Sequence, residues 1–248
     1  IGRGAQEAPA RVQLLGADGV KVLWERSGER SQITDLRVVG DRIWLAVFAD
    51  KWNVEGGWLD NGTFVPAHTA RMAMAMSPLP DGEIAVGRLY GLAPRSDGDL
   101  RVVAADGRAR VLPGLRGVRS IAVEDLDGDG YQDLIVGDGW HSNYGADADP
   151  RVVVYPGPDY AESRVIAWLE GDYTAEHIAV VGEGVDAWLL VTGSRHVHAL
   201  QRDELGWADV VVGPIGDGGD AVVWRRDGGW VVTISGDPAV DIPLELAQ

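Results

Sequence analysis

Short hydrophobic runs separated by polar turns make up most of the 248-residue chain. Typical runs are Ile84-Ala85-Val86, Leu134-Ile135-Val136 and Trp230-Val231-Val232-Thr233-Ile234, with Gly or Asp close to their ends. Runs of this length and β-branched content, bounded by turn residues, are typical of buried strands. The best helical candidate, Arg71 to Met76, is followed at once by Ser77-Pro78, and we interpret it as a strand as well. The pattern predicts an all-β fold.

The strands recur with a regular spacing. One column of equivalent strands comprises Trp44-Leu45-Ala46-Val47, Glu83-Ile84-Ala85-Val86, Asp133-Leu134-Ile135-Val136, Trp188-Leu189-Leu190-Val191 and Trp230-Val231-Val232-Thr233. A turn and an earlier strand precede each of them, at Ile33 to Val39, Arg71 to Met76, Arg119 to Val123, His177 to Val181 and Asp220 to Arg225. The repeat of about 46 residues is long enough for four short strands, which is one blade of a β-propeller.

The two ends of the chain carry incomplete repeats that complement each other. The best-defined repeat has third and fourth strands at Arg151 to Tyr155 and Arg164 to Leu169, whereas the last repeat offers only Asp241 to Leu246. Near the N-terminus, Arg11 to Leu15 and Val20 to Glu25 form a strand pair without an inner pair. Joining the two would leave no unpaired sheet edge. We therefore expect one five-bladed propeller domain over residues 1–248, closed by the N-terminal strands, with residues 1–10 as a loose leader; six blades remain the alternative.

Composition narrows the classes of partner. Lys and Arg number 22 against 38 Asp and Glu, a net charge of −16 that disfavours binding to nucleic acid or to anionic lipid. The absence of cysteine excludes disulfides, thiolate nucleophiles and zinc–thiolate sites. No apolar run approaches the roughly 20 residues that cross a bilayer, so no membrane span is expected. A lipid anchor on residues upstream of Ile1 is left open.

The segment Asp125-Leu126-Asp127-Gly128-Asp129-Gly130-Tyr131-Gln132-Asp133 is the most specific motif in the chain. Its carboxylates occupy loop positions one, three, five and nine, and a glycine at position six permits a sharp turn. A hard cation such as Ca²⁺ requires several oxygen ligands around one point, and the carbonyl of Tyr131 can supply another. Four carboxylates this close in sequence would repel one another without a cation. The motif predicts a calcium site.

The residues from Ser120 to Gly137, followed by Arg151 to Gly157, resemble an FG-GAP/VCBS-type repeat, the propeller repeat of integrin α chains and of many secreted bacterial proteins. The resemblance covers about one blade. It implies a β-propeller that holds calcium between the first and second strands of that blade, with Asp125, Asp127, Asp129, Tyr131 and Asp133 as ligands. The other repeats have Trp or Glu where Asp133 stands, so one strong site is expected. Asp217 and Asp220 form a weaker acidic turn.

The loops that join second to third strands should lie on the face opposite the calcium loop. The densest group of recognition-type residues, Gly139 to Gly145, falls on this face, although Trp140 could instead fill the central channel. Aromatic rings with amide and imidazole donors suit a sugar or another polar ligand. His196 and His198 share one strand face at a spacing that could hold a metal. The candidate ligand-binding residues are Trp140, His141, Asn143, Tyr144, Trp52, Tyr90, Tyr173, His177 and His196.

No nucleophile elbow, phosphate loop, dinucleotide fingerprint or zinc-protease motif occurs in the sequence. We therefore expect a calcium-stabilised binding module for a glycan, a peptide or a protein rather than an enzyme. The resemblance and the calcium loop favour an extracytoplasmic location, and the lack of cysteine favours a periplasmic, secreted or cell-surface bacterial protein. The alternative is a five-bladed glycoside hydrolase or lyase, which would need a carboxylate pair in the central pocket, with Asp50, Glu55 and Asp138 as candidates.

Overall fold

The computed structural model describes residues 10–16, 19–27, 32–50, 52–90, 97–139, 150–182, 184–203, 206–215, 221–226, 229–234 and 240–244. The chain divides into two compact units, residues 1–113 and 114–248, which we describe separately. Within the described ranges the regular structure is antiparallel β-sheet, apart from the short 3₁₀ turn η2 (Gly184–Asp186). In this part of the chain no helix has the length and hydrophobicity needed to cross a membrane.

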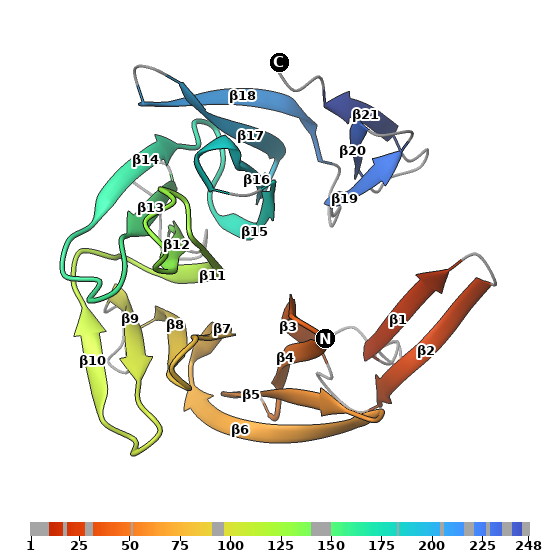
Figure 1. Cartoon of the computed structure of the whole chain (residues 1–248), viewed down its shortest axis with the longest axis vertical. Coiled ribbons are helices and arrows are strands. Elements are labelled where there is room, and N and C mark those ends of the chain that lie inside the picture. The colour runs from red at the N-terminus through yellow and green to blue at the C-terminus, as the bar shows by residue number, and fades with distance from the viewer. Residues whose placement is uncertain are drawn as a thin grey trace, which may run out of the picture. The chain divides into compact units, whose positions relative to one another are not determined.

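The first unit contains three sheets within its described residues (Figure 1). One is the hairpin of β1 (Ala10–Gly16) and β2 (Gly19–Arg26). The second runs in the order β3 (Ile33–Val39), β4 (Arg42–Phe48), β5 (Asn53–Asp60) and β6 (Thr63–Arg71). The third runs in the order β7 (Ala73–Pro78), β8 (Ile84–Tyr90), β9 (Asp97–Val103) and β10 (Ala109–Leu112).

The second unit also has three sheets in its described part, each a meander of consecutive strands. The first comprises β11 (Val118–Glu124), β12 (Asp133–Asp138), β13 (Arg151–Tyr155) and β14 (Arg164–Trp168). The second comprises β15 (Ala175–Val181), β16 (Trp188–Gly193), β17 (His196–Asp203) and β18 (Gly206–Pro214). The third has three strands, β19 (Ala221–Arg226), β20 (Gly229–Ile234) and β21 (Val240–Leu244).

The predicted strand rhythm is confirmed. The expected column forms the second strand of every sheet with three or more described strands: β4, β8, β12, β16 and β20. The strand expected before each of them is the first strand of the same sheet. Four-stranded antiparallel meanders are the blades of a β-propeller. The all-β propeller prediction therefore holds, with a number of sheets that roughly agrees with five blades.

Side chains of the inner strands form the core between neighbouring sheets within each unit. In the first unit Trp44 on β4 is buried, and its indole Nε1 donates a hydrogen bond to the carbonyl oxygen of Met76 on β7, at 2.8 Å. The ring of Trp58 stands edge-on to Trp44, with centroids 5.2 Å apart. Trp44 therefore packs one sheet of this unit against the next.

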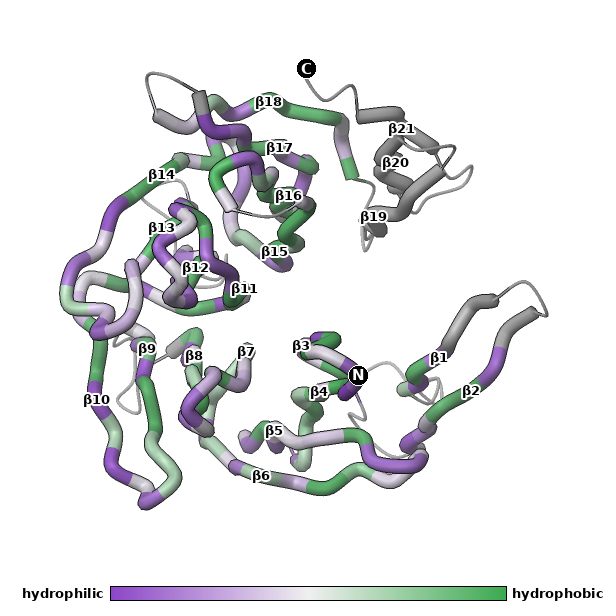
Figure 2. Tube along the Cα trace, viewed as in Figure 1, coloured by the Kyte–Doolittle hydropathy of each residue, from purple (hydrophilic) through white to green (hydrophobic). Residues whose placement is uncertain are grey.

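The second unit repeats this arrangement with aliphatic residues. Ile135 and Val152 of one sheet pack with Ile178 and Leu189 of the next, and all four are fully buried. In both units the outer strands β6, β10 and β14 are more exposed than the inner strands. Figure 2 shows hydrophobic and hydrophilic residues interspersed along these three strands. Because inner strands are covered on both faces and outer strands are not, the continuous hydrophobic runs in the sequence mark the inner strands.

The N-terminal strand pair exists as expected, and among the described residues β1 and β2 form a two-stranded sheet in which each pairs only with the other. β2 also packs against the neighbouring sheet in its own unit, because the rings of Trp24 and Phe64 lie 6.1 Å apart. Completion of the last blade by these strands, like the single-domain boundary, stays a prediction. Residues 1–9 of the expected leader lie outside the described residues.

Candidate functional site

The predicted acidic loop connects β11 to β12. Carboxylate oxygens of Asp125, Asp127 and Asp129 lie within 4.8 Å of one another. Asp125 shapes the loop by accepting hydrogen bonds from the backbone N–H groups of Gly128 at 2.8 Å and Gly130 at 2.9 Å. Both glycines have positive φ, +77° and +90°, which other residues rarely adopt. The chain therefore curls around the three carboxylates.

Asp133 occupies a different position from those three carboxylates. It is buried at the start of β12 and accepts hydrogen bonds from the backbone N–H groups of Leu126 (3.1 Å) and Gly157 (2.9 Å). Burial raises the pKa of Asp133, and the charges of Asp127 and Asp129 raise it further, against the lowering effect of these two hydrogen bonds. The side chain of Tyr131 points outward and is 53% exposed. Asp133 thus ties the loop to the following hairpin.

The donor atoms of the loop fit a hard cation. Three carboxylates at an exposed rim provide oxygen ligands only, which is the ligand class that Ca²⁺ prefers. Their mutual repulsion favours binding of a positive ion. Asp125, Asp127 and Asp129 would hold the ion. The roles of Tyr131 and Asp133 as ligands stay predictions.

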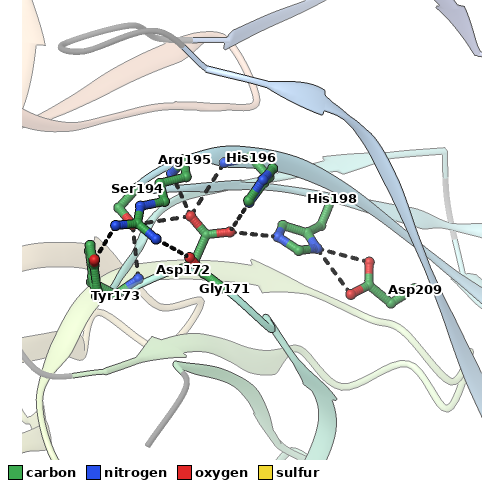
Figure 3. Close-up of polar contacts among 8 residues, drawn as sticks. All are labelled: Gly171, Asp172, Tyr173, Ser194, Arg195, His196, His198 and Asp209. Carbon is green, nitrogen blue, oxygen red and sulfur yellow. Dashed lines mark hydrogen bonds and ion pairs between the residues drawn. The ribbon is translucent and has the colours of Figure 1, made fainter. Parts of the chain in front are cut away.

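A second cluster centres on Asp172, just before β15 (Figure 3). Its side chain is 0% exposed, and its Oδ1 accepts hydrogen bonds from the backbone N–H groups of Arg195 and His196 and from the hydroxyl of Ser194 at 3.1 Å. Its Oδ2 faces His196 Nδ1 at 3.1 Å and His198 Nε2 at 2.9 Å. This cluster ties the segment before β15 to the turn between β16 and β17.

Charge reinforces the cluster. Burial alone would raise the pKa of Asp172, but hydrogen bonds from His198, Arg195, His196 and Ser194 lower it to about 2. Burial alone would lower the pKa of His198, but its hydrogen bonds to Asp172 and to Asp209 on β18 raise it to about 9. Asp172 and Asp209 thus favour the protonated form of His198.

The structure brings together two of the predicted ligand-binding residues, Tyr173 and His196, around Asp172. Arg195 lies between them: its guanidinium donates a hydrogen bond to the Tyr173 hydroxyl and stacks 4.2 Å from the centre of that ring. His177 lies farther along β15, opposite Thr192 of β16. The acidic loop follows β11 whereas Asp172 precedes β15, so the two clusters lie at opposite ends of their sheets.

The other ligand-binding candidates are not part of this group. In the first unit, Trp52 is 46% exposed in the turn between β4 and β5, and Tyr90 is the last residue of β8. Trp140, His141, Asn143 and Tyr144 lie outside the described residues. Their roles stay predictions.

Sequence reasoning did not identify Asp172 and Asp209. Neither belongs to a motif, and with 38 acidic residues in the chain a lone Asp carries little signal. The pair His196 and His198 was the feature of the sequence that could have pointed to this cluster. Two imidazoles on one strand face need an acidic group or a metal as partner when they are buried.

The carboxylates considered for a hydrolase already have structural partners. Asp138 is completely buried, accepts hydrogen bonds from the backbone N–H groups of Arg116 and Gly117, and pairs with Arg151 at 2.7 Å. Asp50 accepts hydrogen bonds from the N–H groups of Trp52 and Asn53 in its own turn. Glu55 lies 3.5 Å from Arg26. These interactions hold turns and strands in place and do not favour the hydrolase alternative.

Solved structures with a similar fold are β-propellers of low sequence identity. TolB from Acinetobacter baumannii is 14% identical with a TM-score of 0.54, over 95% of this chain and 60% of TolB. Sqt1 from Saccharomyces cerevisiae is 12% identical with a TM-score of 0.52, over 97% of this chain and 67% of Sqt1. An auxiliary nutrient binding protein from Bacteroides ovatus is 11% identical with a TM-score of 0.50, over 78% of this chain and 51% of that one. The chain thus spans about half to two thirds of these proteins.

At the level of sequence, no curated protein matches the chain. Residues 117–149 match the FG-GAP repeat family. The matched segment contains β11, the acidic loop and β12. The chain thus has a β-propeller fold, and one segment of it, residues 117–149, matches the FG-GAP repeat.

Proposed function

We propose that this chain is a calcium-stabilised, extracytoplasmic β-propeller that binds a glycan, a peptide or a protein. The observation that carries the proposal is the convergence of Asp125, Asp127 and Asp129 within the segment that matches the FG-GAP repeat. The ion would have a structural role. The loop joins β11 to β12, at the end of its sheet where the first strand finishes. Tyr173 and Arg195 lie at the other end of the neighbouring sheet, where its first strand begins.

The end of the sheet near Asp172 supports the proposed ligand-binding face. Tyr173 is 38% exposed and carries the Arg195 guanidinium on its ring, and His196 lies at the edge of the same group. An aromatic ring beside a guanidinium and an imidazole offers stacking and several hydrogen-bond donors to a polar ligand. Trp140, His141, Asn143 and Tyr144 are proposed to extend this surface.

The proposed location follows from the calcium chemistry. Sites built from a few exposed carboxylates bind Ca²⁺ weakly, with dissociation constants of about 10⁻⁴–10⁻³ M in extracellular modules. Such a site fills only where calcium is abundant, outside the cytosol. We propose a periplasmic, secreted or surface-bound bacterial protein.

The test is a binding screen of the purified chain against immobilised neutral and acidic oligosaccharides and against a peptide library, in the presence of Ca²⁺. We expect specific binding that Tyr173→Ala and Trp140→Ala each abolish, with little change in melting temperature. Tyr131→Ala removes an exposed aromatic ring at the calcium end and serves as the control, which should bind as the wild type does. Loss of binding in the control, with normal binding by Tyr173→Ala and Trp140→Ala, would contradict the assignment of the faces.

A further inference from the structure

Three side chains of the metal-ligating type converge on one point in the second unit. Asp172 Oδ2 lies 3.1 Å from His196 Nδ1 and 2.9 Å from His198 Nε2, and the three candidate ligand atoms all lie within 4.8 Å of one another (Figure 3). Two imidazoles and a carboxylate form a ligand set of zinc and other first-row transition metals, and differ in kind from the all-oxygen acidic loop. We propose that Asp172, His196 and His198 bind a divalent transition-metal cation such as Zn²⁺.

Hydrogen bonds orient the carboxylate of Asp172 in the absence of a metal. Asp172 Oδ1 is held by the N–H groups of Arg195 and His196 and by Ser194, which leaves Oδ2 directed at the two imidazoles. Gly193 lies directly against this carboxyl group, because a Cβ at that position would come within 2.5–2.7 Å of its atoms. A ligand held by such contacts needs little reorganisation to bind, and preorganisation favours affinity.

Asp209 supplies the orienting contact that histidine ligands of metals usually have. One of its carboxylate oxygens lies 3.0 Å from His198 Nδ1. An ionised carboxylate only accepts hydrogen bonds, so Nδ1 carries the proton and Nε2 is the nitrogen that faces Asp172. Binding of a metal would displace the proton between Nε2 and Asp172 Oδ2, while the Nδ1–H bond to Asp209 remains. Such carboxylate–histidine–metal contacts fix the ring and raise its basicity.

Among the three proposed ligands, solvent reaches His196. The side chains of Asp172 and His198 are 0% and 1% exposed, whereas that of His196 is 32% exposed. Three protein ligands leave a further coordination position, as in zinc sites that also bind water or substrate. This position would face solvent beside His196, close to Arg195 and Tyr173.

Without a metal the same residues form a hydrogen-bonded cluster, so the test must measure metal uptake itself. We would titrate Zn²⁺ into the whole chain by calorimetry in excess Ca²⁺, which is added so that Ca²⁺ rather than Zn²⁺ fills the proposed calcium site of the acidic loop. We expect one Zn²⁺ per chain, and Co²⁺ should give the visible absorption bands of an imidazole-ligated ion. His196→Ala removes the partly exposed ligand and should weaken binding by at least 100-fold.

Two further variants test the role of Asp209 and the specificity of Zn²⁺ binding. Asp209→Asn keeps all three ligands and should weaken Zn²⁺ binding about 10- to 100-fold, as loss of an orienting carboxylate does at other sites. His68→Ala removes a histidine of β6 in the other unit and should bind as the wild type does. Circular dichroism confirms that each variant is folded. The proposal is overturned if the folded wild type takes up no Zn²⁺ in excess Ca²⁺, or if His196→Ala and Asp209→Asn bind it with unchanged affinity.

Discussion

Individual aspartates act as anchors at the ends of strands in this acidic chain. Asp133, Asp138 and Asp172 are all buried, and each accepts backbone N–H groups from a neighbouring turn or strand. Ionised carboxylates make stronger hydrogen bonds than neutral groups do. We infer that these three residues hold turns in place against the sheets, in addition to their share in the net charge of −16.

Asp138→Asn tests this structural role. The Oδ1 of Asp138 accepts hydrogen bonds from the N–H groups of Arg116 (2.7 Å) and Gly117 (2.9 Å), and Oδ2 pairs with Arg151. An amide loses the ion pair and places a donor against the guanidinium, so we expect a loss of about 2–4 kcal/mol in the free energy of unfolding. Urea denaturation measures it.

The matched control is Asp106→Asn. Asp106 pairs with Arg108 on the surface, where their side chains are 52% and 87% exposed, and exposed pairs contribute little. Its unfolding curve should coincide with that of the wild type. Equal effects of the two substitutions would contradict the anchoring role of Asp138.

Asp99 makes the stability of the first unit depend on pH. Burial alone would raise its pKa, but hydrogen bonds and charges from Arg88 and Arg101 outweigh burial and lower the pKa below the ordinary value. A lowered folded-state pKa contributes stability above the unfolded pKa of about 3.9, and this stability is lost as the pH falls through the folded value. The difference in unfolding free energy between wild type and Asp99→Asn should be constant near neutral pH and shrink below about pH 4. A difference of the same size at pH 3 and pH 7 would contradict this.

At the scale of strands and sheets, the second strands β4, β8, β12 and β16 contribute to the packing between neighbouring sheets within each unit. Trp44 on β4 is buried, donates a hydrogen bond to the carbonyl of Met76 on β7, and packs against Trp58. Trp44→Phe removes this buried hydrogen bond and opens a small cavity, so we expect a loss of about 2–3 kcal/mol in the free energy of unfolding. Trp168→Phe changes a ring on the outer strand β14 that is 50% exposed and should cost less than about 0.5 kcal/mol. Thermal unfolding of the two variants measures the difference, and similar losses would contradict a stabilising role for the contact of Trp44 with Met76.

The strands could be predicted because their determinants are local. A run such as Leu134-Ile135-Val136 between Asp133 and Gly137 marks a buried strand, and the meander follows because short turns join antiparallel neighbours. The convergence of Asp125, Asp127 and Asp129 could also be predicted, because these residues are close in sequence. The Asp172 cluster was not, because Asp172 and His198 are 26 residues apart and meet only through the packing of three segments.

At the scale of the whole molecule, the account combines two expectations: a closed five-bladed propeller, and a calcium ion that stabilises it. Each of the six sheets in the described residues is antiparallel, and the N-terminal hairpin with two strands and the last sheet with three are both short of the four strands of a complete blade. Closure would make the chain unfold as one cooperative unit. Calcium bound only by the folded state would stabilise that unit by about 2.7 kcal/mol at 100 times its dissociation constant.

Differential scanning calorimetry of the whole chain, with Ca²⁺ and with a chelator, tests both expectations at once. We predict a single transition, raised in Ca²⁺ by about 5–10 °C for a chain of this size. Asp127→Ala should unfold at the chelated temperature with or without Ca²⁺, whereas Asp81→Ala, an exposed residue in the equivalent turn between β7 and β8, should respond as the wild type does. Two separate transitions, or a calcium-induced shift that Asp127→Ala retains, would contradict the account.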